Sequence, residues 1–337
     1  PVSIKTQFVP SVIAYNSADA AQAAEKLNDK KRILAEKYFA GIGLETYAVC
    51  NGNKCCCSQV LEHIEHAGVN SADSISVTPA DPSVPASVIE NVNVQTAKLC
   101  ERLNLSGLIC FEYVYFNNTL YLLSAKPGYV RGVPFTVRAT GIDYIDLCVS
   151  YMLGEDVNKP ETPCGKVSVR VPVFSFEKLP GADVRLDLGA KSTGEVMATA
   201  DTFEKALLTG LTSAGMRIKR NGGVLITVRN EDKQEAIRIA DMFSQLGFRI
   251  YATSGTANIF NSNFIATNAV RKIHEDGYTI KDLLLSGKVD YVISTPTKGR
   301  RYAADDTRIR RIAVQRRIPT FTSLDTAAAL AKALKEI

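Results

Sequence analysis

The last third of the chain alternates short β-branched runs with amphipathic helices, and this pattern restricts the fold more than any other feature. VLITVR (224–229) follows two glycines and is typical of a buried strand. From Asp232, apolar residues recur at helical spacing up to Gly247, which we expect to end the helix. The same alternation continues, with strands expected at 248–255, 264–270, 289–296 and 319–324 and helices at 279–288, 306–317 and 325–336. Such alternation predicts a Rossmann-like, doubly wound parallel sheet.

The first two thirds have a different, α+β character. Apolar runs at 107–116 and 119–127 flank Asn117-Asn118, which predicts a tight β-hairpin. Further strands are expected at 2–8, 45–52 and 54–63, and helices at 18–28, 85–103 and 142–156. Residues 155–197 are rich in Pro and Gly, so we expect them to connect two domains. The predicted boundaries are a first domain over 1–154, a connection over 155–216 and a last domain over 217–337.

Length and composition place the chain among soluble globular proteins of two or three domains. It has 337 residues, of which 46% are hydrophobic and 22% charged. No apolar run approaches the roughly 20 residues that cross a bilayer, so we expect no membrane partner. The opening residues lack the features of a signal peptide, and a start at Pro1 suggests a processed chain or a piece of a longer one. Eight cysteines without a secretory signal favour a reducing, cytoplasmic location.

Positive charge is concentrated in the last third. Residues 217–337 carry 21 Lys and Arg against 12 Asp and Glu, a net charge of +9, whereas residues 1–216 carry 19 against 23, a net of −4. An anionic ligand or partner is therefore expected in the last domain. The arginines of 308–317 have no interleaved aromatic residues and no nucleic-acid module around them. We interpret them as a solvated helix face or a contact between copies in a homo-oligomer, and expect no nucleic-acid partner.

Hydroxyl and ammonium groups gather where the predicted parallel strands end. Because ligands of doubly wound sheets bind beyond the carboxyl ends of the strands, we expect these residues to share one site. The candidates are Thr227, Lys233, Thr253, Thr256, Lys272, Ser294, Thr295 and Thr297. Hydroxyls, cations and helix N-termini together suit a phosphate group. The alternative is that the Ser and Thr residues serve only as caps and turns.

Two further motifs could indicate metal sites. Cys55, Cys56 and Cys57 are consecutive, so they cannot all point into one tetrahedral site, and thiols on a strand are the favoured interpretation. His63 and His66 stand three residues apart in EHIEHAG, which could place a ligand pair on a helix. The segment lacks the HExxH order and a third ligand, so a hydrogen-bonding His in a binding cleft is the better prediction.

Three segments together resemble the large subunit of carbamoyl-phosphate synthase. They are LEHIEHAGVNSADSISVTP (61–79), LYLLSAKPGYVRGVPFTVRATG (120–141) and STGEVMA (192–198), in the family's order. The last third is similar to that enzyme's allosteric domain, of the methylglyoxal-synthase-like (MGS-like) fold, and the resemblance covers essentially the whole chain. It implies the end of an ATP-grasp domain that phosphorylates carbamate with MgATP. It also implies a domain that binds UMP, IMP or ornithine, in pyrimidine or arginine biosynthesis.

Residue by residue, the resemblance implies a degenerate ATP site. His63 matches an ATP-contacting His, Arg131 matches an Arg of the segment that reads NPRASR in the family, and Glu112 stands where the family has a metal-binding Gln. Ser124, however, stands at the position of the metal-binding Glu and Lys126 at that of an Asn. Two Mg²⁺ ions that bridge phosphates need carboxylate oxygens, so metal chemistry is not expected, although Glu112 could ligate one ion.

Two other stretches differ from the family. Gly128 replaces the first Arg of the NPRASR segment, and the family's glycine-rich lid aligns with residues 7–12, which contain no glycine. On this resemblance the chain begins inside the ATP-grasp region, after part of the adenine pocket. The effector-contacting positions match at Thr227, Lys233, Thr253, Thr256 and Lys272, while Ser294 replaces an Asn.

The function expected from the sequence is therefore binding of a phosphorylated effector in the last domain, next to an inactive ATP-grasp region. The resemblance implies the remainder of the large subunit and the glutaminase subunit as partners. Two alternatives stay open: a ligase segment that is active once its N-terminal part is supplied, and a non-enzymatic scaffold. A methylglyoxal-synthase-type lyase is not favoured, because the chain has no GGD-like loop that carries a carboxylate base.

Overall fold

The computed structural model describes residues 1–5, 12–26, 33–52, 54–155, 165–178, 183–295 and 304–336. The chain forms two compact units. One contains residues 1–38, 173–194 and 211–337, and the other contains 39–172 and 195–210. Within the described residues, no helix combines the length and apolar character needed to span a membrane.

Residues 1–38 form a small antiparallel sheet with one helix. The strands are β1 (Val2–Lys5), β2 (Val12–Ala14) and β3 (Leu34–Lys37), in the order β2-β1-β3, and the helix is α1 (Ser17–Lys26). A small cluster of Ile4, Ala14 and Ala23 packs the helix against the strands. The segment aligned with the glycine-rich lid lies almost entirely in residues 6–11, outside the described residues.

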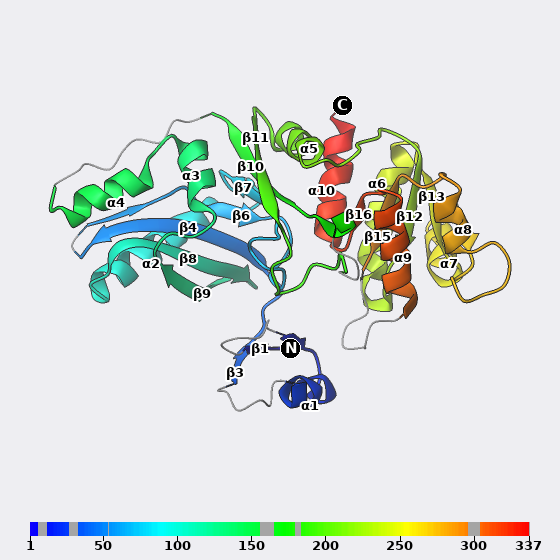
Figure 1. The fold of residues 1–337 in the computed structure, drawn as a ribbon, viewed down its shortest axis with the longest axis horizontal. Helices are drawn as coiled ribbons and strands as arrows, with labels where there is room; N and C mark the ends of the chain where they lie inside the picture. The colour runs from blue at the N-terminus through cyan, green and yellow to red at the C-terminus, as the bar shows by residue number, and fades with distance from the viewer. Residues whose placement is uncertain are drawn as a thin grey trace. The chain divides into compact units, whose positions relative to one another are not determined.

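An eight-stranded sheet forms the core of the second unit (Figure 1). Its order is β11-β10-β7-β6-β4-β8-β9, with β5 paired to β4. The strands are β4 (Ile42–Asn51), β5 (Cys55–Cys57), β6 (Leu61–His63), β7 (Ser76–Thr78), β8 (Ser106–Phe116), β9 (Thr119–Pro127), β10 (Val167–Val173) and β11 (Gly194–Ala200). The predicted hairpin is confirmed: Asn117 and Asn118 have φ of 48° and 59°, the left-handed values of a type I′ turn between β8 and β9.

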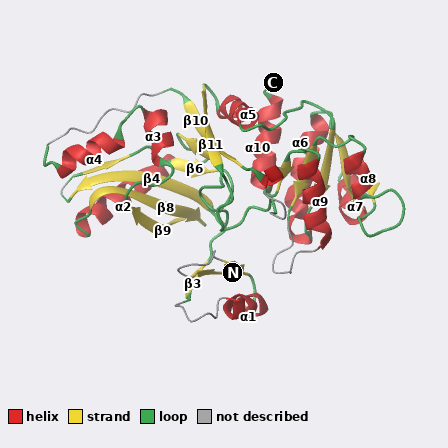
Figure 2. Ribbon diagram, in the orientation of Figure 1, coloured by secondary structure: helices red, strands yellow, loops and turns green. Residues whose placement is uncertain are grey.

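Helices cover both faces of this sheet because its buried strands are apolar on both sides. Helix α2 (Ala86–Arg102) lies on one face, and α3 (Val133–Thr140) and α4 (Tyr144–Met152) lie on the other (Figure 2). Side chains alternate between the faces along β4. Leu44, Ala48 and Cys50 pack on the α2 side, whereas Tyr47 and Val49 pack on the side of α3 and α4.

The last third forms the predicted doubly wound parallel sheet. Its strands are β12 (Gly223–Thr227), β13 (Arg249–Thr253), β14 (Thr267–Val270), β15 (Tyr291–Ser294) and β16 (Thr320–Phe321). They pair in parallel in the order β14-β13-β12-β15-β16, so the order reverses between β12 and β15. Its helices are α6 (Lys233–Gln245), α7 (Ser254–Ser262), α8 (Ile280–Leu285), α9 (Ala304–Gln315) and α10 (Leu324–Lys335), with a short 3₁₀ turn at Asn230–Asp232. Helix α5 (Phe203–Ser213) and a 3₁₀ turn at Phe176–Lys178 precede this part of the chain, and most of α5 belongs to the other unit.

Three local predictions need correction. Helix α7 was not expected, because Thr253-Ser254-Gly255 reads as the end of a strand, whereas the chain turns into a helix directly after Thr253. Helix α10 begins at Leu324 and not at Asp325, and Ser323 caps it, since its hydroxyl accepts the backbone N–H of Asp325. Arg310 is not on a solvated face: its side chain is 2% exposed and donates two hydrogen bonds to Asp183, at 2.7 and 2.6 Å.

The segment predicted to connect two domains contains regular structure. Residues 155–216 include β10, β11 and α5, and the first two of these are strands of the large sheet. Val169 and Val171 of β10 are buried, and the strand pairs with β7. The boundaries at 154/155 and 216/217 remain a prediction of domain organisation.

Candidate functional site

The carboxyl edge of the parallel sheet brings several predicted residues together. Thr227 ends β12 directly beside Ser294, which ends β15, and Thr253 ends β13 beside β14. Thr227 and Ser294 therefore stand where the strand order reverses, the position at which doubly wound sheets bind their ligands.

Two neighbouring hydroxyls at this edge have different surroundings. Thr295 is held by the fold: its N–H donates to the Thr227 carbonyl at 3.2 Å, and its Oγ1 accepts the N–H of Arg229 at 3.2 Å. The Ser294 hydroxyl is fully buried, and no hydrogen-bond partner for it is found among the described residues. A buried hydroxyl without a partner costs about 1–3 kcal/mol, which a ligand acceptor would recover. Thr297 lies outside the described residues.

Lys233 places an ammonium over the first turn of α7. Its Nζ lies 3.7 Å from the position that a Cβ atom on Gly255 would take. Within the described chain, no carboxylate forms an ion pair with Lys233. The N–H groups of the first helical turn point in the same direction, since they have no partner within the helix. Thr256 lies in this turn and is buried. Together, the ammonium and these N–H groups can hold an anion.

Lys272 lies farther along the same edge, just after β14. It is exposed, and its charge acts on Asp306 in the first turn of α9. His274 Nδ1 is hydrogen-bonded to the Asp305 carboxyl group of the same turn. Burial raises the pKa of Asp306, although Arg310 and Lys272 oppose that effect. The loop after β14 and the start of α9 therefore meet at this edge, where Lys272 acts on a carboxyl group.

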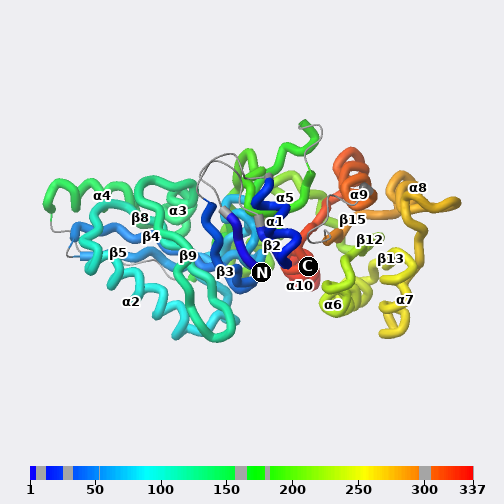
Figure 3. Tube along the Cα trace, turned by 90° about the horizontal axis from the view of Figure 1, so that it is seen from below, coloured from blue at the N-terminus to red at the C-terminus, as the bar shows by residue number. Residues whose placement is uncertain are grey.

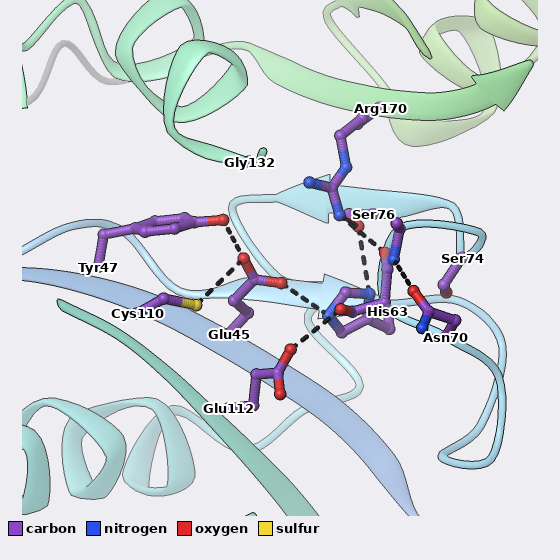
Figure 4. Close-up of polar contacts among 12 residues, drawn as sticks. Glu45, Tyr47, His63, Asn70, Ser74, Ser76, Cys110, Glu112, Gly132 and Arg170 are labelled. Carbon is purple, nitrogen blue, oxygen red and sulfur yellow. Dashed lines mark hydrogen bonds and ion pairs between the residues drawn. The ribbon is translucent and has the colours of Figure 1, made fainter. Parts of the chain in front are cut away.

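A second polar cluster lies in the eight-stranded sheet, on the side of α3 and α4 (Figure 4). Arg170 of β10 donates to Ser76 Oγ at 2.8 Å, and Ser76 Oγ lies 3.2 Å from His63 Nδ1. His63 Nε2 lies 3.1 Å from Glu45 Oε2. The order of donors is consistent: Arg170 donates to Ser76, which can donate to Nδ1, so the N–H at Nε2 is left to donate to the Glu45 carboxylate.

Glu45 is the centre of this cluster. Tyr47 also donates its hydroxyl to the carboxylate. Burial tends to raise the pKa of Glu45, but the hydrogen bond from His63 and the charge of Arg170 outweigh it and lower the pKa to about 2. The backbone of Gly132 passes close to the Tyr47 hydroxyl and Arg170, where a side chain would clash. The cluster is closed on itself, and His63 is held by protein groups at both ring nitrogens.

His63 and His66 are not a ligand pair on a helix, as one interpretation of EHIEHAG proposed. His63 ends the short strand β6, while His66 is exposed and follows a bend at residues 64–65. Because the chain turns between them, His63 is directed into the sheet's polar cluster and its two nitrogens are both used.

Glu112 lies next to this cluster and is enclosed by donors. It pairs across the strands with Glu45. Its Oε1 accepts Lys126 Nζ at 2.7 Å and Ser71 Oγ at 3.0 Å, and its Oε2 accepts Ser124 Oγ at 2.6 Å. Burial raises the pKa of Glu112, but the Lys126 ammonium more than compensates and lowers it. A carboxylate paired with an ammonium does not fit Mg²⁺, which needs anionic oxygens facing it.

Arg131, the third residue predicted from the ATP site, forms an ion pair with Glu195 of β11, with Nε 3.3 Å from Oε2. His63, Glu112 and Arg131 were predicted from the sequence as residues of an ATP site, and all three lie in or beside this cluster. Glu45 and Arg170 were not predicted. A signal for both was available, since each is a single charged residue within a run of buried strand residues, ETYAVC and VSVRVPV.

Comparisons with known proteins agree with both parts of the fold. Residues 235–322 match the MGS-like domain family. The whole chain is 37% identical, over 350 aligned residues, to a carbamoyl phosphate synthase large chain from Lachnoclostridium phytofermentans, and it spans 33% of that protein's length.

Two solved structures share the fold over 64% of this chain. One is N5-carboxyaminoimidazole synthase from Aspergillus clavatus in complex with ADP and 5-aminoimidazole ribonucleotide, with a TM-score of 0.50, 13% identity and 61% of its chain covered. The other is an ADP complex of N5-carboxyaminoimidazole ribonucleotide synthetase, with a TM-score of 0.51, 16% identity and 60% of its chain covered. At this identity the likeness concerns the fold alone. Over its full length the chain is thus a homologue of the C-terminal part of the carbamoyl phosphate synthase large chain, with an ATP-grasp-like region and an MGS-like domain at its C-terminus.

Proposed function

We propose that the MGS-like domain binds a phosphorylated effector at the carboxyl edge of its parallel sheet. The observation that carries the proposal is the buried Ser294 hydroxyl, which has no partner among the described residues, whereas the hydroxyl of the adjacent Thr295 accepts the N–H of Arg229. Lys233 supplies a positive charge with no ion-pair partner in the described part of the chain, next to the first turn of α7. Hydroxyl donors, an ammonium and helical N–H groups are what a phosphate dianion binds.

The effector class follows from the family and from the charge. UMP or IMP would place a phosphate near Lys233 and leave a base for the rest of the edge, where Lys272 adds a second cation. Ornithine is the alternative, since its carboxylate is also an anion, but its ammonium groups would prefer the acidic side near Asp305 and Asp306.

We also propose that the ATP-grasp-like region no longer performs two-metal phosphoryl transfer. Its support is the pairing of Glu112 with Lys126 and Ser124, which supplies a cation where the reaction needs anionic ligands. The same groups can still contact a phosphate, so nucleotide binding without metal-dependent turnover is compatible with this proposal. The alternative, a ligase segment completed by an N-terminal part, predicts turnover on mixing that depends on Glu112.

The proposed partners follow from how much of its relative's length the chain spans. Because the chain spans one third of its relative, the remainder of a large subunit and a glutaminase subunit are the proposed partners, and effector binding would act on their activity. A non-enzymatic scaffold would keep the fold and the partners but bind no effector.

Isothermal titration calorimetry of the folded chain with UMP, IMP, ornithine and inorganic phosphate tests the proposal. We expect one-to-one binding of at least one phosphorylated nucleotide, with weaker binding of phosphate alone. If none of these ligands binds a chain that circular dichroism shows to be folded, the effector proposal fails and the scaffold is favoured.

A further inference from the structure

Consecutive cysteines of β5 point to opposite faces of the large sheet. Cys55 and Cys57 pack with the core on the α2 side, whereas Cys56 packs with the core of α3 and α4. The argument that three consecutive cysteines cannot share one metal site therefore excludes only Cys56. Strand alternation removes the middle residue and leaves the outer two on one face.

Two more thiols reach the same place from other elements. Cys50, near the end of β4, is the register partner of Cys55, and their Sγ atoms are 3.5 Å apart. Cys55 Sγ is 3.7 Å from Cys57 Sγ. Cys100 comes from the C-terminal part of α2, which runs along β4 and β5 (Figure 3). The Sγ atoms of Cys50, Cys55 and Cys100 all lie within 4.8 Å of one another.

The separations among Cys50, Cys55 and Cys100 match three ligands of a tetrahedral thiolate site, since zinc–sulfur bonds of about 2.3 Å at tetrahedral angles place sulfur atoms about 3.8 Å apart. Cys57 Sγ lies 3.7 Å from Cys55 Sγ but outside this group of three, so its side chain would have to turn toward the ion to bind it. None of the seven described cysteines is in a disulfide. Cys50 and Cys100 are almost fully buried, while Cys55 and Cys57 are partly exposed and offer an approach for an ion.

We propose that Cys50, Cys55 and Cys100 hold a structural zinc ion that joins β4, β5 and the end of α2, with Cys57, next to Cys55 on the same face, turning in as the fourth ligand. Three of the four ligands come from two paired strands and the fourth from a helix, so the ion would tie α2 to its sheet. Four sulfur ligands and no open position are typical of structural rather than catalytic zinc. The site lies on the α2 side of the sheet, and the Glu45 cluster lies on the opposite side, so this proposal is independent of the proposed function.

Cys56 and Cys110 provide matched controls. Both are buried thiols of the same sheet, but both belong to the core on the α3 and α4 side. Cys110 Sγ also donates to Glu45 Oε1 at 3.6 Å on that side. A thiol that takes no part in holding zinc would behave as these two do.

The test is metal binding by the full, tag-free chain, reduced and stripped of metal. After addition of Zn²⁺ and desalting, elemental analysis should find about one zinc per chain. Co²⁺ should give the intense visible bands and thiolate charge-transfer absorption of a tetrahedral sulfur site. Cys50→Ser and Cys100→Ser should weaken zinc binding by more than the roughly 10–100-fold typical of an outer-shell loss, whereas Cys56→Ser and Cys110→Ser should leave it unchanged.

The wild-type chain also decides the matter if a buried-cysteine variant does not fold. A reduced, folded wild type that retains no stoichiometric zinc would overturn the proposal. The proposal would also be overturned if both Cys57→Ser and Cys100→Ser bound zinc as tightly as the wild type. A third contrary result would be a Cys50–Cys55 disulfide, and no bound zinc, in the presence of zinc and reductant.

Discussion

The two sheets of this chain treat their polar groups in opposite ways. In the eight-stranded sheet, Glu45 is hydrogen-bonded by His63 and Tyr47 and acted on by the Arg170 charge, and Glu112 is bound by Ser124 and Lys126, so each carboxylate is satisfied within the protein. At the edge of the parallel sheet, the Ser294 hydroxyl and the Lys233 ammonium find no such partners among the described residues. A site that has closed on itself stabilises the fold, whereas donors left unsatisfied are suited to a ligand from outside.

The largest effect is expected on the free energy of unfolding, from a substitution in the cluster around Glu45. Arg170→Met removes the guanidinium that donates to Ser76 and lowers the pKa of Glu45, which leaves a buried carboxylate with less compensation. Unfolding in urea should show a loss of about 3–5 kcal/mol. Arg138→Met, at an exposed helical position, is the control and should stay within about 0.5 kcal/mol. Equal effects of the two changes would contradict a buried network.

A pH dependence should come from Glu62, a neighbour of His63 in β6. Burial raises the pKa of Glu62 from 4.5 to about 7. The backbone N–H of Asp81, which donates to the carboxyl group at 2.7 Å, lowers the pKa but does not cancel the effect of burial. Between these values the folded chain holds a proton that the unfolded chain has released, so stability falls as the pH rises from about 4.5 to about 7.

Glu62→Gln should remove this dependence and stabilise the chain by about 2–3 kcal/mol at pH 8, with little effect at pH 4.5. Denaturant midpoints of wild type and variant at the two pH values measure it. Parallel stability curves for the two proteins would show that Glu62 titrates normally.

At the parallel sheet, Lys233→Met should weaken binding of the phosphorylated effector by roughly 10–100-fold, because a charged hydrogen bond contributes about 1.5–3 kcal/mol. Its effect on stability should be small, since no ion pair of Lys233 is found in the described part of the chain. Lys332→Met, at an exposed position of α10, is the matched control. Unchanged affinity in Lys233→Met would place the anion elsewhere.

A smaller effect, on metal affinity, is expected when the groups around Glu112 are changed to those that the resemblance assigns to a metal site. The double variant Ser124→Glu, Lys126→Asn removes the ammonium at Glu112 and adds a second carboxylate. Binding of Mn²⁺, followed by electron paramagnetic resonance, should tighten at least about tenfold. Lys126→Met alone serves as the control for loss of charge, and a double variant no better than wild type would argue against a lost metal site.

The sequence predicts those parts of the fold that depend on local pattern. The alternation of residues 217–337 predicts the parallel sheet, and Asn117-Asn118 predicts the hairpin, because both signals lie within a few residues. Helix α7 is missed since its first residues, Ser254 and Gly255, have low helix propensity and follow an apolar strand.

The sites depend on distant pairings that one sequence does not show. Arg170 reaches Ser76 across 94 positions, and Cys100 meets Cys50 and Cys55 only because α2 packs on β4 and β5. The strand-end residues of the parallel sheet were predictable, because parallel strands end at the same edge wherever they stand in the chain. Which hydroxyl is left unsatisfied was not, since that depends on the hydrogen bonds of Thr295.

The most direct test of the contrast between the two sheets is a pair of calorimetric titrations on one sample. One uses UMP or IMP and the other uses the corresponding nucleoside, and each is repeated with MgADP present. The account predicts one-to-one binding of the phosphorylated ligand, at least tenfold weaker binding of the nucleoside, and no competition from MgADP. Equal binding of nucleotide and nucleoside, or displacement of the nucleotide by MgADP, would contradict it.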